Sequence, residues 1–138
     1  MKKVLIAGAA RTPIGALNGC FAQLSATELG RIAAMAALAR SGLSAESMDE
    51  VIIGNVLQAG LGQNPARQIA IGCGVPVTAP AYTVNQVCGS GLKAIDLAFR
   101  AVRAGEAAAI LAGGTESMSG APYILPADRK STRLNSSH

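Results

Sequence analysis

The sequence predicts an α/β fold in which a mostly parallel mixed sheet carries helices on both faces. Short runs of β-branched and aliphatic residues alternate along the chain with longer segments whose apolar residues recur at helical spacing. Such alternation requires crossover connections, which join parallel strands. Half of the 138 residues are hydrophobic but only 3% are aromatic. We therefore expect many small side chains, which let helices pack closely on a sheet.

An aliphatic run and a capping signal indicate the first elements. Residues 4–7, VLIA, predict a buried first strand. Ser25 and Glu28 have the spacing of a capping box, which opens a helix that ends near Gly42. One apolar face of this helix consists of Leu29, Ile32, Ala33, Ala36 and Ala37. A short second helix is expected at residues 44–50.

The remaining elements alternate between strand and helix. Strands are predicted at residues 51–56, 82–84 and 108–112, and helices at residues 65–70 and 89–104. The last helix carries apolar residues at helical spacing, namely Leu92, Ile95, Phe99 and Val102. Chemistry in parallel sheets gathers at the carboxyl ends of the strands, which directs attention to the segments that follow them.

Cys88 lies where the strand at residues 82–84 becomes the helix at residues 89–104. The first turn of a helix offers unpaired N–H groups and the positive end of the macrodipole, both of which favour a negative charge. A thiol there can have a pKa well below its usual value of about 8.5 and act as a nucleophile. The neighbours Gly89, Ser90 and Gly91 are small, so a flat acyl group could approach the sulfur.

The residues alone leave other interpretations open. A free cysteine is more often a small buried hydrophobe, and Gly-Ser-Gly at a helix start also suits tight packing or phosphate binding. For Cys20 and Cys73 we expect inert packing. Isolated carboxylates at caps and loop mouths are usually structural, and we expect this of Glu28 and Glu116. Arg67 is expected to be a solvated or paired surface group.

Gly113 and Gly114 follow the last predicted strand. Without a Cβ they could let backbone approach a ligand or a neighbouring loop, or they could permit a tight turn. The residues favour neither interpretation.

Composition excludes several classes of protein. Three cysteines without paired spacing favour a reducing, cytoplasmic compartment over a disulfide framework. No Cys-x-x-Cys pair or histidine cluster occurs, so no metal site is expected. No apolar run approaches the roughly 18 residues that span a bilayer. The net charge is +4, but the last ten residues contribute three of the twelve Lys and Arg. A basic patch for nucleic acid is therefore not supported.

The last residues differ in composition from the rest of the chain. Residues 128–138, DRKSTRLNSSH, have no apolar periodicity and resemble translated sequencing-adapter read-through. We interpret them as a non-native tail and place the domain at residues 1–127. The only histidine, His138, lies in this tail. The domain then holds no imidazole to activate a cysteine.

Four ordered motifs make the chain resemble the thiolases over essentially all of residues 2–127. The motifs are RTPIG at residues 11–15, GQNPARQ at 62–68, NQVCGSG at 85–91 and GGTESMS at 113–119. The resemblance implies the N-terminal half of a thiolase-like fold, truncated before its last strand. Thiolase subunits pair two such halves in a five-layered arrangement and add a loop domain that covers coenzyme A.

The resemblance implies that Cys88 accepts an acyl group from a CoA thioester, and that its backbone N–H is one donor of the oxyanion hole. It also implies a Claisen condensation of two acetyl-CoA to acetoacetyl-CoA plus CoA, or the reverse thiolysis. CoA enters as part of the substrate, and neither a metal nor a redox cofactor is used. The intact protein is expected to be a homodimer or homotetramer without nucleic-acid or membrane partners.

The family's base histidine and its proton-abstracting cysteine come from the second half, which is absent here. We therefore expect the 138 residues alone to be inactive. Two other functions fit the residues less well. One is a decarboxylating 3-ketoacyl synthase-type condensing enzyme, and the other is a non-catalytic phosphate-binding module. A half that lacks its twin should also expose an apolar face and a sheet edge, which invite association.

Overall fold

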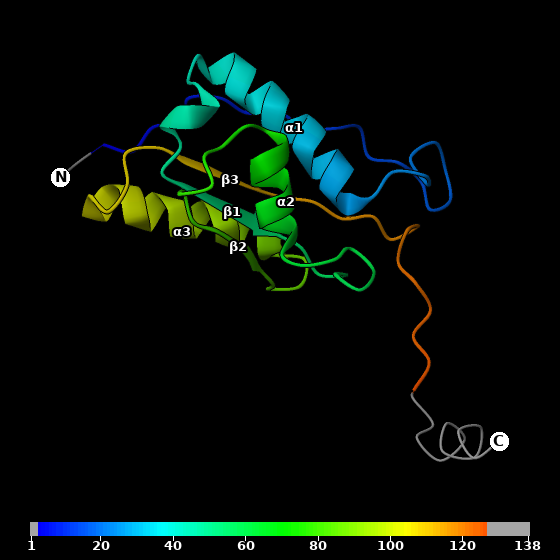
Figure 1. The fold of residues 1–138 in the computed structure, drawn as a ribbon. Coiled ribbons are helices and arrows are strands. Elements are labelled where there is room, and N and C mark those ends of the chain that lie inside the picture. Colours follow the sequence, from blue (N-terminus) through cyan, green and yellow to red (C-terminus); the bar gives the residue numbers. More distant parts are fainter. Residues whose placement is uncertain (1–2, 127–138) are drawn as a thin grey trace.

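The computed structural model describes residues 3–126. The tail at residues 128–138 therefore lies outside the described residues. Four helical elements and three strands follow one another along the chain (Figure 1). They are, in order, α1 (Ala26–Ser41), η1 (Ala45–Ser47), β1 (Glu50–Gly54), α2 (Pro65–Gly72), β2 (Ala81–Val84), α3 (Ser90–Ala104) and β3 (Ile110–Gly114).

The three strands form one parallel sheet in the order β2-β1-β3. The predicted α/β fold is thus confirmed. Helices α1 and α2 cover one face of the sheet and α3 covers the other (Figure 1). Because side chains alternate along a strand, Val51 and Ile53 of β1 pack toward α2, whereas Ile52 packs toward α3.

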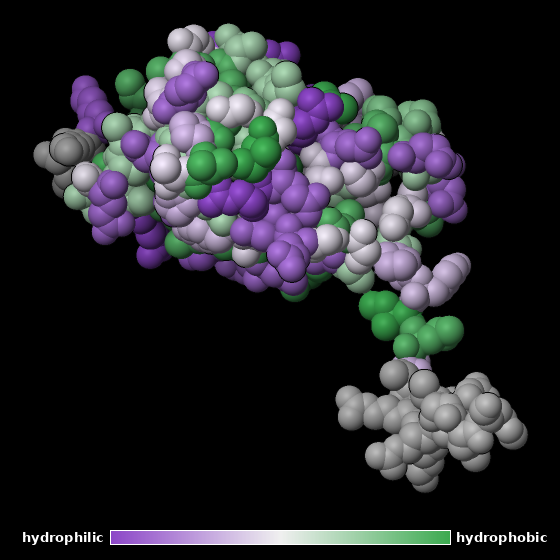
Figure 2. All heavy atoms as spheres, in the orientation of Figure 1, coloured by the Kyte–Doolittle hydropathy of each residue, from purple (hydrophilic) through white to green (hydrophobic). Residues whose placement is uncertain are grey.

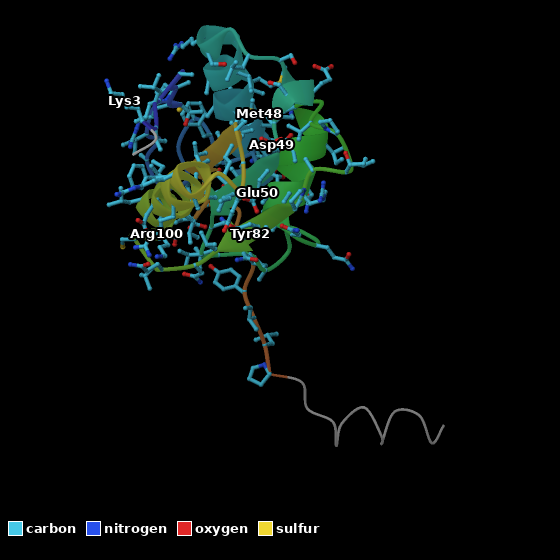
Figure 3. All side chains as sticks on the ribbon, turned by 90° about the vertical axis from the view of Figure 1, so that its left-hand side faces the viewer. Lys3, Met48, Asp49, Glu50, Tyr82 and Arg100 are labelled. Atoms are coloured by element: carbon cyan, nitrogen blue, oxygen red, sulfur yellow. The ribbon has the colours of Figure 1, made fainter. Side chains whose placement is uncertain are left out.

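Two polar side chains explain why β1 and β3 differ from their predicted bounds. The Asp49 carboxylate accepts the amides of Ala108 and Ala109 at 2.6 and 3.1 Å, so β3 begins only at Ile110. Figure 3 shows Asp49 at the start of β1. At the other end, the Glu116 carboxylate takes amides that follow β1, which ends at Gly54.

The prediction for α1 is correct at its ends. The Ser25 hydroxyl accepts the Glu28 amide at 3.2 Å, and the Glu28 carboxylate accepts the Ser25 amide at 2.8 Å. These bonds form the capping box. The bonds that the Glu28 carboxylate accepts from the Ser25 amide and the Ser25 hydroxyl lower the pKa of Glu28. Gly42 ends the helix in the left-handed region, with φ of 71°. The short second helix is a single 3-10 turn.

The apolar face of α1 named above is only partly buried: Leu29, Ala33, Ala36 and Ala37 are half-buried and Ile32 is exposed. The residues that α1 buries fully are Ala26, Gly30 and Ala34. A Cβ on Gly30 would lie 2.5 Å from the Ile69 side chain of α2, so only the small face fits there. Close helix packing has therefore selected the small side chains over the large ones.

Helix α3 also buries small side chains, since Ala94 and Ala98 pack against the sheet. Leu97 is partly buried against the same cluster, but Leu92 is 74% exposed. Two others, Ile95 and Phe99, lie on the same side of the helix and are also exposed. Within the described residues, α3 thus presents a large apolar face that no other element covers.

The predicted first strand is also wrong. Residues 4–7 form no strand, and Leu5 and Ile6 are 82% and 83% exposed. A strand needs a paired neighbour, and the described residues provide none for this segment. The segment instead runs past α1, where the Arg40 guanidinium donates to the Ala9 carbonyl at 2.8 Å.

Exposed apolar side chains also mark the end of the described chain. Tyr123, Ile124 and Leu125 are fully or largely exposed. Figure 2 shows a green, hydrophobic cluster where this end of the chain leaves the folded body. Each helix within residues 3–126 is too short or too polar to cross a membrane.

Candidate active site

Cys88 lies between the end of β2 at Val84 and the start of α3 at Ser90. Its side chain is exposed, and it forms no disulfide. The N-cap of α3 is Gly89, which contributes no capping side chain. The cysteine thus stands just before the first turn of a four-turn helix, at the carboxyl end of the sheet, as the sequence predicted.

The backbone turns sharply immediately before Cys88. Val87 has φ of 51°, in the left-handed region that a β-branched residue rarely adopts. Such a conformation costs on the order of 1–3 kcal/mol and persists only where the surroundings impose it. We call residues 85–90 the elbow, because here the chain reverses from β2 into α3.

Two side chains impose this conformation. The Asn85 carboxamide oxygen accepts the Val87 amide at 2.9 Å. The Ser90 hydroxyl accepts the Gln86 amide at 2.9 Å and donates to the Val87 carbonyl at 2.6 Å. Ser90 is 4% exposed, so water competes little for these bonds. Asn85 and Ser90 thus hold the strained residue from both sides.

The amide of Cys88 takes no part in the hydrogen bonds that hold the elbow. Those bonds use the amides of Gln86, Val87, Gly89 and Ser90.

Glycines bring the first turn of α3 directly onto the sheet. A Cβ on Gly54 of β1 would lie 2.4 Å from the carbonyl carbon of Ser90 and 2.6 Å from the amide nitrogen of Gly91. A Cβ on Gly114 of β3 would lie 3.0 Å from the Cα of Gly91. Gly54, Gly91 and Gly114 therefore form a glycine seat for the helix that carries the elbow.

A partly buried cluster of hydrogen bonds, the clamp, joins the two loops beside this seat. The Glu116 carboxylate accepts the Asn55 side-chain amide and the backbone amides of Val56 and Leu57, each at 3.0 Å. Asn55 is 1% exposed and also donates to the Thr115 carbonyl at 2.9 Å. The prediction that Glu116 is structural is in accord with this arrangement, since its oxygens hold loop backbone in place.

Comparisons with known proteins point to one family. The family described as "Thiolase, N-terminal domain" matches residues 4–138. The chain belongs to the thiolase family.

Two of its curated relatives are bacterial. An acetyl-CoA acetyltransferase of Cupriavidus necator is 52% identical over 134 residues, which are 97% of this chain and 34% of that protein. A probable acetyl-CoA acetyltransferase of Escherichia coli is 52% identical over 137 residues, 99% of this chain and 35% of that protein. The chain therefore spans about a third of the length of these relatives.

A solved structure has the same fold. The crystal structure of a thiolase from Ascaris suum in complex with coenzyme A matches with a TM-score of 0.86 and 43% identity. The match covers 88% of this chain and 32% of that one.

The thiolase motif GQNPARQ ties α2 to β2. The Asn64 side chain donates to the Ala81 carbonyl at 2.9 Å and accepts the Thr83 hydroxyl at 3.0 Å. The same hydroxyl accepts the Ala66 amide at 3.1 Å. Asn64 caps the helix and Pro65 fills its first position, where a missing N–H costs nothing.

The thiolase motif GGTESMS ties β3 to the start of α1. The Thr115 hydroxyl donates to the Ala26 carbonyl at 2.6 Å, and the Ser117 hydroxyl donates to the Leu24 carbonyl at 2.9 Å. Gly114 ends β3 and allows the backbone of α3 to approach the strand at Gly91, a contact that neither interpretation had foreseen. Gly113 has open space where its Cβ would be.

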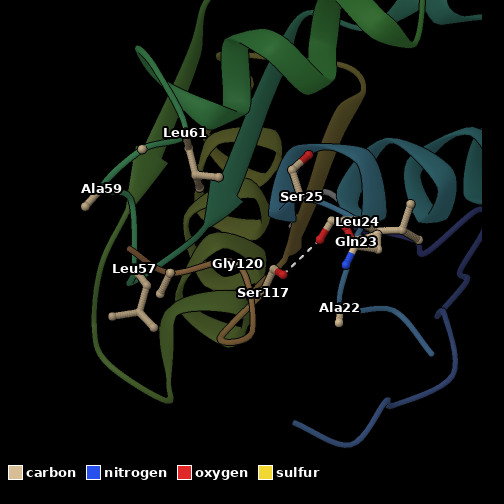
Figure 4. A pocket seen from close by; sticks show the side chains of 11 residues that line it. Ala22, Gln23, Leu24, Ser25, Leu57, Ala59, Leu61, Ser117 and Gly120 are labelled. Atoms are coloured by element: carbon tan, nitrogen blue, oxygen red, sulfur yellow. Dashed lines mark hydrogen bonds between the residues drawn. The ribbon is translucent and has the colours of Figure 1, made fainter. Parts of the chain in front are cut away.

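Ser117 and Leu24 also line a shallow pocket of about 220 Å³ (Figure 4). Its walls are the segment before α1 and the loops after β1 and β3. None of its eleven lining residues is charged, and Cys88 is not among them. The pocket is therefore separate from the elbow.

The other candidate residues have different surroundings. Cys20 is exposed, so the expectation that it packs is wrong: its loop lies on the surface. Cys73 is half-buried at the end of α2, and burial raises the pKa of its thiol, in keeping with inert packing. Arg67 is half-buried, and its Nη1 atom is buried without a hydrogen-bond partner among the described residues.

Sequence reasoning missed the positional roles of Asn85 and Ser90. Each bond has a recognisable local spacing. An Asn whose side chain takes the amide two residues on forms an Asx-turn, and a Ser that bonds the carbonyl three residues back is a known local motif. Neither spacing could have revealed the positive φ of Val87, since valine is a poor residue for that conformation.

Proposed function

We propose that the whole protein is an acyltransferase of the thiolase type. It joins two acetyl-CoA molecules into acetoacetyl-CoA and CoA, or catalyses the reverse thiolysis. The observation that carries this proposal is the exposed Cys88 at the start of α3, behind the strained Val87, in a chain 52% identical to an acetyl-CoA acetyltransferase.

The first half-reaction transfers an acetyl group to Cys88. Its thiolate sulfur attacks the carbonyl carbon of acetyl-CoA, the carbon–sulfur bond to CoA breaks, and CoA leaves as a thiolate that takes up a proton. The carbonyl oxygen bears negative charge in the tetrahedral intermediate, and we expect the backbone N–H of Cys88 to donate to it.

The second half-reaction forms the carbon–carbon bond. A second acetyl-CoA loses a proton from its α-carbon, and the resulting carbanion attacks the acetyl group on Cys88. The bond between acetyl carbon and sulfur breaks, which releases acetoacetyl-CoA and returns the cysteine thiolate. CoA is carried by the substrates, so this chemistry calls for neither a metal nor a redox cofactor.

The 138-residue chain alone should turn over negligibly. The proposed reaction needs a base for the thiol and an acceptor for the α-proton, and general acid–base catalysis contributes about 10²–10⁴-fold at each such step. Among residues 3–126 there is no histidine to serve as a base. We expect the whole protein to be a cytoplasmic homodimer or homotetramer.

A chimera tests the proposal. Residues 4–126 would replace the matching segment of the Escherichia coli relative, and acetoacetyl-CoA thiolysis would be measured in the chimera and in its Cys88→Ser variant. We expect thiolysis in the first and none in the second. A folded chimera that remains inactive would refute the proposal.

The same chimera separates acetyl transfer from a decarboxylating reaction. Acetyl-CoA should acylate Cys88, as peptide mass spectrometry would show, whereas a malonyl thioester should release no carbon dioxide. Decarboxylation of the malonyl donor would favour the condensing enzyme of the 3-ketoacyl synthase type. For the 138-residue chain, a thiolysis rate of about one per second, within the usual range for enzymes, would contradict its expected inactivity.

A further inference from the structure

Ser90 makes a set of contacts that helix capping does not explain. It is the first residue of α3, not its N-cap, and its hydroxyl points back into the elbow. The hydroxyl accepts from the Gln86 amide and donates to the Val87 carbonyl. It therefore bonds the peptide group before Gln86 and the peptide group after Val87. At 2.6 Å, the bond to Val87 is among the shortest side-chain bonds of the described residues.

We infer that Ser90 is a positioning residue for Cys88: its buried hydroxyl keeps Val87 in the left-handed conformation that presents the thiol at the first turn of α3. The relevance to catalysis rests on the proposed function. The geometry of the elbow does not depend on it, because every contact involved lies within residues 85–90.

The backbone explains why a hydroxyl is needed. Valine has a strong preference for negative φ, so the elbow stores strain that some contact must balance. If the Ser90 hydroxyl is removed, the Val87 carbonyl keeps only the backbone amide of Ser90, at 3.1 Å. The Gln86 amide loses its acceptor altogether. Val87 can then relax to negative φ, which rotates the following peptide and moves Cys88 away from the helix start.

The three cysteines of the chain make this testable in one molecule. Cys88 reports on the elbow, the exposed Cys20 reports on a surface loop, and the half-buried Cys73 reports on unfolding. The experiment treats the 138-residue chain with iodoacetamide at neutral pH and follows each cysteine by peptide mass spectrometry. The readout is the alkylation rate of Cys88 divided by that of Cys20.

Ser90→Ala should lower this ratio about fivefold, the effect of a typical net hydrogen bond. Val87→Gly provides the decisive background, since glycine adopts positive φ without strain. In that background Ser90→Ala should change the ratio by less than about twofold. Ser117→Ala is the matched control, because it removes another partly buried hydroxyl that donates to a carbonyl, and it should leave the ratio unchanged.

Three results would overturn the inference. One is that Ser90→Ala lowers the alkylation ratio equally in the parent chain and in the Val87→Gly variant. Another is an effect of Ser117→Ala as large as that of Ser90→Ala. The third concerns folding. If Ser90→Ala speeds alkylation of Cys73, that variant has partly unfolded, and adding Val87→Gly should restore slow alkylation of Cys73. Fast alkylation of Cys73 in the double variant would refute the role assigned to Val87.

Alkylation needs neither CoA nor acyl transfer, so the two proposals can fail separately. If the chimera described above does not transfer acetyl groups but the Ser90 series behaves as expected, only the proposed function is refuted. If acetyl transfer occurs but Ser90→Ala changes the alkylation ratio equally with and without Val87→Gly, only the positioning role is refuted.

Discussion

Replacing Gly54 with alanine should displace the first turn of α3 and destabilise the chain. The added Cβ would lie 2.4 Å from the carbonyl carbon and 2.5 Å from the carbonyl oxygen of Ser90, whereas ordinary contacts begin at 3.4 Å. Helix and strand must therefore separate by about 1 Å, and both contacting groups are backbone, which cannot rotate away. Overpacking of this kind costs about 1–3 kcal/mol.

The glycine seat supplies its own graded controls. A Cβ on Gly114 would lie 3.0 Å from the Cα of Gly91, a contact that a shift of a few tenths of an ångström relieves. A Cβ on Gly113 would meet nothing within 4 Å. Gly113→Ala should be neutral or slightly stabilising, because glycine within a strand costs about 0.5–1 kcal/mol relative to alanine.

Urea denaturation followed by circular dichroism measures the series. With an m-value of about 1–1.5 kcal/mol per molar, a loss of 2 kcal/mol lowers the midpoint by about 1.3–2 M. The expected order of destabilisation is Gly54→Ala, then Gly114→Ala, then Gly113→Ala. Equal midpoints for the Gly54 and Gly113 variants would refute the claim that backbone contact seats α3 on the sheet.

Three further changes address the clamp, acid stability and the uncovered face of α3. Glu116→Ala leaves two loop amides without acceptors and should lower the unfolding free energy by about 1–3 kcal/mol, measurable in urea. Backbone hydrogen bonds lower the pKa of Asp49, so its carboxylate stabilises the fold above about pH 4, a contribution lost as the pH falls through the lowered pKa. Asp49→Asn should accordingly lower the Tm at neutral pH, and the two Tm values should become equal as the pH falls. A Tm difference that does not change with pH would contradict this. Leu92→Glu should reduce self-association in sedimentation experiments, whereas Val77→Glu, at an equally exposed apolar site elsewhere, should not.

Local signals in the sequence predicted the elements whose ends are set by nearby residues. Ser25 and Glu28 cap α1 within one turn, and Pro65 starts α2, so their spacing was sufficient. Cys88 was correctly placed at the start of α3 for the same reason: a β-branched run, a short link and a helical pattern lie side by side in the chain.

Long-range choices could not be predicted in this way. Periodicity shows that a helix has apolar residues, but it does not show which face meets the sheet. In α3, Ala94 and Ala98 are buried against the sheet, whereas Leu92 and Phe99 are exposed. The aliphatic run at residues 4–7 has strand composition, yet composition cannot supply a neighbouring strand.

The order of the strands in the sheet has a consequence for how the chain folds. Gly54 is in register with Gly114, and the latter follows both α2 and α3 in the chain. The central strand β1 therefore cannot pair with β3 until the chain has been synthesised past residue 114. Pairings between such distant segments slow folding, because the entropy cost of closing the loop between them precedes the stabilisation from their contacts. The glycine contacts that support the start of α3 should therefore be among the last parts of the described chain to become rigid.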